Sequence, residues 1–96
     1  MNLALDFDDT ITLDRYFWGQ FINLAKSSGH TVTIVTSRHS VPIRDNEDIM
    51  MYAKGWGVEV IYTSGEPKAE YYKADVWIDD YPASIPPYSQ LHMESI

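Results

Sequence analysis

The alternation of apolar and polar positions along the chain predicts four strands separated by helices. Residues 3–5 form a short apolar run, and residues 31–36 form a β-branched run, Thr-Val-Thr-Ile-Val-Thr. Both have the composition of buried strands, and residues 58–62 and 75–80 predict two more. Because strands that alternate with helices form parallel sheets, we expect an α/β protein with a three-layer Rossmann-like fold and a small parallel sheet of about four strands.

Two stretches carry apolar residues at helical spacing. Residues 16–26 form the first, and Gly29 follows where a helix would end. Residues 46–54 form the second, which is also followed by glycine. Residues 67–73 begin with a proline, a residue common in the first turn of a helix, and predict a third, shorter helix. Each predicted helix lies between two predicted strands, as a parallel sheet requires.

The length of 96 residues favours a single small domain. The intervals from Thr10 to Thr36 and from Thr36 to Lys68 are each filled by one or two predicted elements, which leaves no room for an inserted domain. Residues 81–96 carry three prolines and no clear periodicity. We expect this tail to wrap over the core of one domain that spans residues 1–96.

Composition narrows the classes of function. The formal net charge of −7, from 14 acidic and 7 basic residues, argues against general affinity for nucleic acid or anionic membranes. The chain has no cysteine, so oxygen or imidazole ligands would hold any metal, and hard cations are the first expectation. The apolar start is too short for a secretory signal, and no segment reaches the length of a membrane span. We therefore expect a cytoplasmic protein.

Polar side chains follow three of the predicted strands at the point where each strand ends. The carboxyl ends of parallel strands meet at one edge of a sheet, where α/β proteins bind their ligands. Alone, the Asp-x-Asp-x-Thr string of residues 6–10 also fits a solvated acidic turn, but its position after a buried strand favours a site. Four carboxylates at one edge would repel one another unless a cation lay among them. The residues concerned are Asp6, Asp8, Thr36, Ser37, Asp79 and Asp80.

In this arrangement the chain resembles the haloacid dehalogenase superfamily of aspartate-nucleophile phosphatases. The first motif of that family matches residues 3–11, Leu-Ala-Leu-Asp-Phe-Asp-Asp-Thr-Ile. The second matches residues 32–36, and the acidic fourth matches residues 76–80. The third motif is a single lysine, matched by Lys68 or Lys73. The resemblance covers most of the chain and implies Mg²⁺-dependent hydrolysis of a phosphate monoester.

The resemblance implies a role for each catalytic carboxylate. Asp6 would attack phosphorus and form an aspartyl-phosphate, which divides hydrolysis into two displacements. Asp8 would protonate the leaving oxygen and later take a proton from the attacking water. Mg²⁺ would be held by the Asp6 carboxylate, the Asp8 backbone carbonyl and Asp79. Asp80 would be either a further ligand of the ion or a residue that orients its ligands.

The resemblance also implies a set of residues around the phosphate. Thr36 would hold a phosphate oxygen through its hydroxyl and its neighbouring backbone N–H. Ser37 and Arg38 follow it directly and complete the predicted substrate contacts, although Arg38 also fits a solvated loop. The lysine would neutralise charge on the phosphoryl group. We favour Lys68 over Lys73 because Lys68 begins the predicted helix, close to the carboxyl ends of the strands.

The substrate remains open at the level of sequence. The absence of a cap domain is typical of superfamily members that act on large phosphoesters or that cover the site through a neighbouring subunit, so a homo-oligomer is also possible. The lysine spacing and the residues 77–82, Trp-Ile-Asp-Asp-Tyr-Pro, are instead similar to deoxyribonucleotidases. A nucleotide or a polynucleotide end is therefore the more specific alternative. An alternative of another class is a non-catalytic module that binds Mg²⁺ or phosphate.

Overall fold

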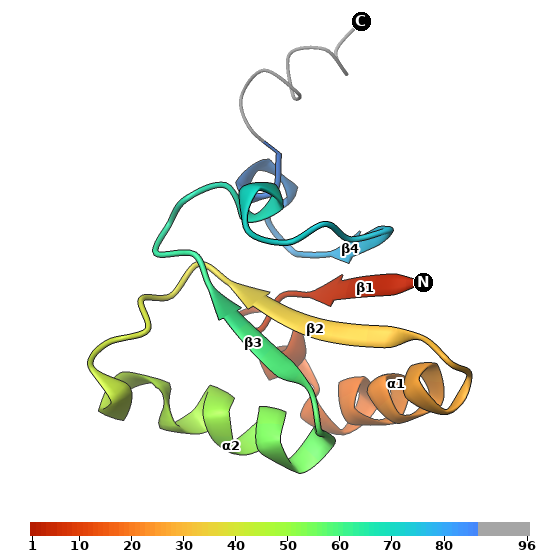
Figure 1. Cartoon of the computed structure of the whole chain (residues 1–96). Helices are drawn as coiled ribbons and strands as arrows, with labels where there is room; N and C mark the ends of the chain where they lie inside the picture. The colour runs from red at the N-terminus through yellow and green to blue at the C-terminus, as the bar shows by residue number, and fades with distance from the viewer. Residues whose placement is uncertain (87–96) are drawn as a thin grey trace, which may run out of the picture.

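The computed structural model describes residues 1–86, which form an α/β fold with a four-stranded sheet (Figure 1). All four strands are parallel, in the order β3-β2-β1-β4. The predicted fold class is therefore confirmed, and each predicted strand is present. The elements are β1 (Asn2–Leu5), α1 (Arg15–Ser27), β2 (Thr31–Thr36), α2 (Glu47–Trp56), β3 (Glu59–Tyr62) and β4 (Val76–Ile78).

Helices α1 and α2 lie on the same face of the sheet, where the hydrophobic core forms (Figure 1). Leu5 of β1 and Ile34 of β2 are fully buried there, with Ile22 of α1 and Ile49 of α2. Side chains alternate between the two faces of a strand, so Thr33 lies on the opposite face. That face is covered by the link from β3 to β4, which forms the third layer.

This third layer is irregular, which corrects the prediction of a helix at residues 67–73. Only a single 3₁₀ turn, Lys68–Glu70, is present. The chain then extends across the sheet, because Thr33 Oγ1 donates a hydrogen bond to the Tyr72 hydroxyl at 3.2 Å and the Tyr72 ring packs edge-on against Trp77. A continuous helix would shorten this segment, which has to reach the start of β4.

The tail begins with a 3₁₀ turn, Pro82–Ser84. The carbonyl of Ile85 accepts a hydrogen bond from the backbone N–H of Ala69 at 2.8 Å, which fixes this turn against the third layer. The rest of the predicted wrap, residues 87–96, lies outside the described residues. Within residues 1–86, no link between elements holds an additional domain, and no helix is long and apolar enough to cross a membrane.

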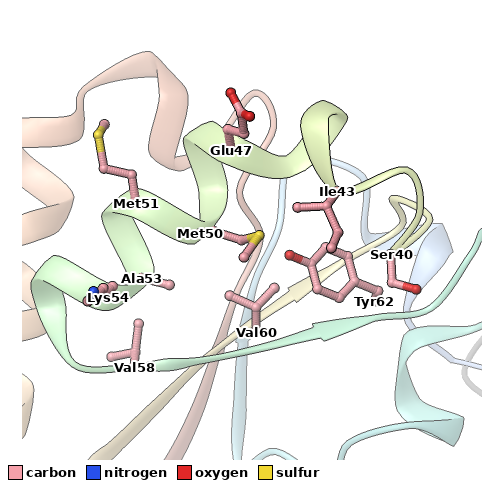
Figure 2. A pocket seen from close by; sticks show the side chains of 10 residues that line it. All are labelled: Ser40, Ile43, Glu47, Met50, Met51, Ala53, Lys54, Val58, Val60 and Tyr62. Atoms are coloured by element: carbon pink, nitrogen blue, oxygen red, sulfur yellow. The ribbon is translucent and has the colours of Figure 1, made fainter.

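Strand β3 lies at one edge of the sheet and leaves an open apolar groove of about 670 Å³ beside helix α2. Figure 2 shows Met50 of α2 directed toward Val60 of β3, with Ile43 and Tyr62 at one end. Within the described part of the chain, no strand pairs with the outer side of β3. The groove therefore exposes apolar side chains along one edge of the molecule.

Candidate active site

A pocket of about 180 Å³ lies at the carboxyl ends of the strands. After β3 the chain crosses the sheet and adds β4 on the far side of β1, which makes this edge the point where the strand order changes direction. All the predicted site residues except Arg38 line the pocket. Asp9, Tyr81 and Ser84 complete its wall, and sequence reasoning assigned no role to these three.

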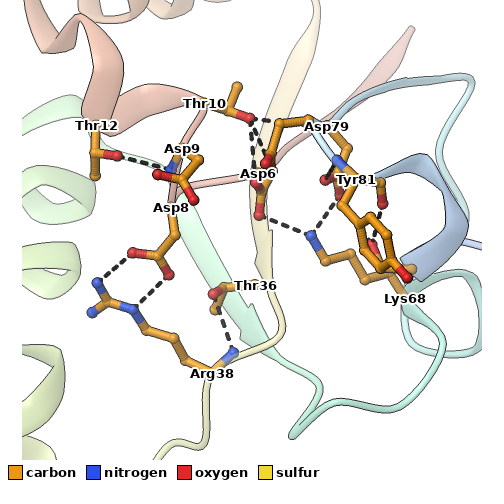
Figure 3. Close-up of polar contacts among 12 residues, drawn as sticks. Asp6, Asp8, Asp9, Thr10, Thr12, Thr36, Arg38, Lys68, Asp79 and Tyr81 are labelled. Carbon is orange, nitrogen blue, oxygen red and sulfur yellow. Dashed lines mark hydrogen bonds and ion pairs between the residues drawn. The ribbon is translucent and has the colours of Figure 1, made fainter.

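Lys68 lies at one side of the site, beside Asp6 and Asp79 (Figure 3). Its Nζ donates to Asp6 Oδ1 at 2.8 Å and to Asp79 Oδ2 at 2.6 Å. Only 2% of the Lys68 side chain is exposed, and the two carboxylates are almost as buried, so the ion pairs are shielded from water. Lys73 is exposed and does not line the pocket. Of the two candidate lysines, the structure places Lys68 at the site.

Thr10 links the ends of β1 and β4. Its Oγ1 lies 3.2 Å from Asp6 Oδ2 and 3.5 Å from Asp80 Oδ1, and it accepts a hydrogen bond from the Asp80 backbone N–H at 3.3 Å. The turn that brings Thr10 back toward Asp6 passes through Asp9, whose φ of 60° is left-handed, a conformation that aspartate tolerates better than most residues. The Asp-x-Asp-x-Thr string of residues 6–10 includes Thr10, but the contacts of Thr10 are visible only in the folded turn.

Thr36 ends β2 in the wall of the same pocket, and it is 1% exposed. Its Oγ1 accepts a hydrogen bond from the backbone N–H of Arg38 at 3.2 Å. Its backbone carbonyl accepts from the N–H of Thr63 at 2.9 Å, which holds the end of the strand in place. Among residues 1–86, the Thr36 hydroxyl makes no hydrogen bond as a donor, so its proton can be donated to a bound group.

Asp8 points toward Arg38, away from Asp6 and Lys68 (Figure 3). The guanidinium holds both Asp8 oxygens, from Nε to Oδ2 at 2.9 Å and from Nη2 to Oδ1 at 2.8 Å. The same guanidinium pairs with Asp48 of α2 at 2.7 Å. Sequence reasoning missed Asp48, since no local pattern connects a residue on a helix to a strand end. The predicted contact of Arg38 with substrate remains a prediction.

Three carboxylates lie together in the pocket, and Lys68 is the one lysine or arginine among the described residues that line it. Oxygen atoms of Asp6, Asp79 and Asp80 lie within 4.8 Å of one another. With all four side chains ionised, Lys68 balances only one of the three negative charges. Burial and the neighbouring Asp80 carboxyl raise the pKa of Asp6 to about 7, and Lys68 only partly opposes this. An all-oxygen cluster with excess negative charge fits a hard divalent cation, which would relieve the repulsion.

The raised pKa of Asp6 predicts a pH-dependent stability in metal-free buffer. Between the ordinary pKa of 3.8 and about 7, the folded chain retains a proton that the unfolded chain has lost. Folding is therefore favoured at low pH, and this contribution is lost as the pH rises through about 7. We expect the Tm measured in EDTA to fall from about pH 5 to about pH 8, and to fall less in Asp6→Asn. If the Tm of wild type and the Tm of Asp6→Asn fell equally over this pH range, the pH dependence would not come from Asp6.

Comparison of the chain with protein-family models, with curated proteins and with solved structures gave no match.

Proposed function

We propose that this chain is a Mg²⁺-dependent phosphohydrolase that cleaves a phosphate monoester through an aspartyl-phosphate on Asp6. The observation that carries the proposal is the buried Lys68, which bridges Asp6 and Asp79 beneath the pocket. Phosphoryl transfer depends on positioning and on cations that neutralise the transferring group. The resemblance of residues 3–11, 32–36 and 76–80 to motifs of haloacid dehalogenase phosphatases supports the same reaction.

In the first step, a carboxylate oxygen of Asp6 forms a bond to phosphorus while the bond to the ester oxygen breaks. Lys68 and Thr10 hold one Asp6 oxygen each, which fixes the orientation of the nucleophile. Lys68 lines the pocket, and we propose that its ammonium neutralises charge on the phosphoryl oxygens. The hydroxyl of Thr36, which also lines the pocket, would provide a further donor to the phosphate.

Asp8 provides the proton transfers of both steps. It lines the same pocket, and 48% of its side chain is exposed. Both of its oxygens accept from Arg38, so the carboxyl has to leave this ion pair before it can carry a proton to the leaving oxygen. It donates a proton to that oxygen in the first step. In the second step it takes a proton from the water that attacks the aspartyl-phosphate, and this releases phosphate and restores Asp6.

Mg²⁺ would balance the charge of the phosphate and of the acidic cluster when bound. Asp6, Asp79 and Asp80 have the side-chain oxygens to hold it, since their carboxylates already lie together. The part that the family resemblance assigns to Asp8 is its backbone carbonyl, so its side chain is not needed as a ligand. Asp79 is fixed by the Tyr81 backbone N–H, which donates to its Oδ1 at 2.9 Å.

The size of the pocket supports an ester whose leaving group stays outside it. The volume of about 180 Å³ is below the roughly 300–1,000 Å³ of sites that enclose a whole small molecule. We propose that the phosphoryl group binds inside, next to Thr36 and Ser37, and that the rest of the substrate extends from the mouth. This favours a bulky phosphoester, and both a nucleotide and a polynucleotide end meet that description.

A panel of phosphate esters tests the proposed function. We expect phosphate release in the presence of Mg²⁺ from at least one of four classes: nucleoside monophosphates, 3′-phosphorylated oligonucleotides, sugar phosphates and phosphopeptides. EDTA should stop the release. Binding of Mg²⁺ and phosphate without turnover on any class would instead support the non-catalytic module.

Replacing Asp8 with Asn should slow turnover by about 10²-fold to 10⁴-fold, the loss typical of a general acid or base. The affinity for Mg²⁺ should change little, because the backbone carbonyl is the ligand. Steady-state kinetics and calorimetric Mg²⁺ titration measure the two effects. Weakened Mg²⁺ binding with normal turnover at saturating Mg²⁺ would contradict the assigned role.

A further inference from the structure

Strand β3 has one unpaired edge. It pairs with β2 on one side, and within the described part of the chain no strand lies on its other side. The N–H of Thr63, directly after β3, donates to the carbonyl of Thr36 in β2 at 2.9 Å and therefore points inward. Backbone groups point alternately to the two sides of a strand, so the N–H and carbonyl of Val60, three residues earlier, point outward. Such an edge is a template on which another strand can pair.

The apolar groove lies beside this edge, on the side of the sheet that α2 covers. Its strand side consists of Val58, Val60 and Tyr62, which share one face of β3 because side chains alternate along a strand. On its other side, Met50 of α2 is 45% exposed and Ile43 is 64% exposed. Figure 2 shows Met50 directed toward Val60. Outward backbone groups and exposed apolar side chains therefore occur together along the same edge.

Two opposite charges line the groove on α2. Glu47 lies near the start of the helix and Lys54 near its end, and Met50 lies between them (Figure 2). Glu47 and Lys54 are seven residues apart, which is about two helical turns on one side of α2. A half-turn about an axis through the middle of this surface would exchange the positions of the two charges. The surface is therefore complementary to itself.

We propose that two copies of the chain form a twofold dimer by pairing their β3 strands antiparallel, with Val60 of one copy opposite Val60 of the other. The two Val60 residues would exchange two backbone hydrogen bonds, as directly opposed residues of antiparallel strands do. The two four-stranded sheets would then join into one continuous sheet. A closed twofold interface requires a patch that contacts itself, and the edge of β3 with its groove is such a patch.

The side chains of the groove fit this arrangement. The twofold axis is perpendicular to the joined sheet, so both α2 helices lie on the same face and run antiparallel beside each other. Met50 and Val60 of the two copies would cover one another at the centre. Glu47 of each copy would lie near Lys54 of the other, which fixes the register of the pair. An apolar centre with a charged rim is the usual anatomy of a protein interface.

Replacing Val60 with Pro tests the pairing of the strands. Proline removes the outward N–H and places its ring at the edge, whereas the hydrogen bonds between β3 and β2 do not use this group. Sedimentation velocity over a range of protein concentrations should show a dissociation constant raised by at least about tenfold. Val60→Ile is the matched control, because it keeps the N–H and an apolar β-branched side chain, and it should remain dimeric.

Charge exchange tests the register of the helices without changing the strand. Glu47→Lys and Lys54→Glu each place like charges near one another across the axis and should weaken the dimer by at least about tenfold. The double exchange restores opposite charges and should recover the dimer. Glu66→Lys reverses a charge at an exposed position outside the groove and should leave the dimer unchanged. Circular dichroism and Tm report whether each variant is folded.

Cross-linking tests where the two copies meet. The chain has no cysteine, so a single introduced thiol gives a clean signal. Met50→Cys places one thiol of each copy near the axis, and a short bismaleimide reagent should link the two copies rapidly. Leu24→Cys is the control, because Leu24 is exposed on α1 and does not line the groove. Its cross-linking should be at least about tenfold slower.

Two results would overturn the proposal. One is a wild-type chain that stays monomeric at all concentrations. The other is a dimer that Val60→Pro and the two single charge reversals leave unchanged, with equal cross-linking of Met50→Cys and Leu24→Cys, because the interface would then lie elsewhere. If Val60→Pro does not fold, the charge reversals and the cross-linking rates decide the question without it.

Discussion

Replacing Asp6 with Asn is expected to reduce phosphate release to the uncatalysed background. An amide oxygen is a poor nucleophile toward phosphorus, and it carries no charge to hold a cation. The change keeps the shape of a side chain that is 8% exposed, so the amide has room in the site. Phosphate release is measured with Mg²⁺ over a long incubation, so that a small residual rate above the background can be detected.

Glu66→Gln is the control for this variant. It removes one negative charge from an exposed position in the link after β3, and Glu66 does not line the pocket. Its turnover should equal that of wild type. If Asp6→Asn retained a rate near that of Glu66→Gln, covalent catalysis by Asp6 would be ruled out.

Replacing Lys68 with Met should damage both turnover and stability. Met keeps most of the side-chain volume but leaves Asp6 and Asp79 buried without their cation. Breaking a buried ion pair from one side costs about 3–5 kcal/mol. Turnover also loses the cation beside the phosphoryl group, and we expect kcat/KM to fall by about 10³-fold or more. Urea unfolding in EDTA and steady-state kinetics with Mg²⁺ measure the two losses.

Lys73→Met is the matched control, since Lys73 is exposed and lies outside the pocket. Its kcat/KM should stay within a few-fold of wild type, and its unfolding free energy should change by less than about 0.5 kcal/mol. The reverse order of damage would show that the wrong lysine had been assigned to the phosphate. A stable and fully active Lys68→Met protein would remove the main support for the proposed function.

The sequence predicted the strands and the edge at which the site forms, for a simple physical reason. Buried parallel strands are continuous apolar runs, and their carboxyl ends meet at one edge. The pocket that contains Asp6, Thr36 and Asp79 follows from that rule alone. The sequence also placed Lys68 near this edge, and Lys68 does line the pocket. That prediction assumed a helix, whereas the structure has a single 3₁₀ turn.

Other features of the site could not be predicted because they depend on side-chain contacts between distant segments. The pairing of Arg38 with Asp48 joins a loop to a helix, and neither residue carries a motif. The extended link after Lys68 follows from the contact of Tyr72 with Thr33, across the sheet. Helical propensity in a short segment is too weak to resist such tertiary contacts.

The most direct test of the proposed reaction is to detect the phosphorylated enzyme. Asp8→Asn is mixed with 4-nitrophenyl phosphate and Mg²⁺, because this leaving group departs without a proton and the hydrolysis of the intermediate is slowed. The mixture is quenched in acid and reduced with borohydride, which converts an aspartyl-phosphate to homoserine, and the peptides are analysed by mass spectrometry. The account predicts homoserine at position 6 only, and none when substrate is omitted. Release of nitrophenol by this protein with Asp6 unmodified, or with homoserine at another position, would contradict it.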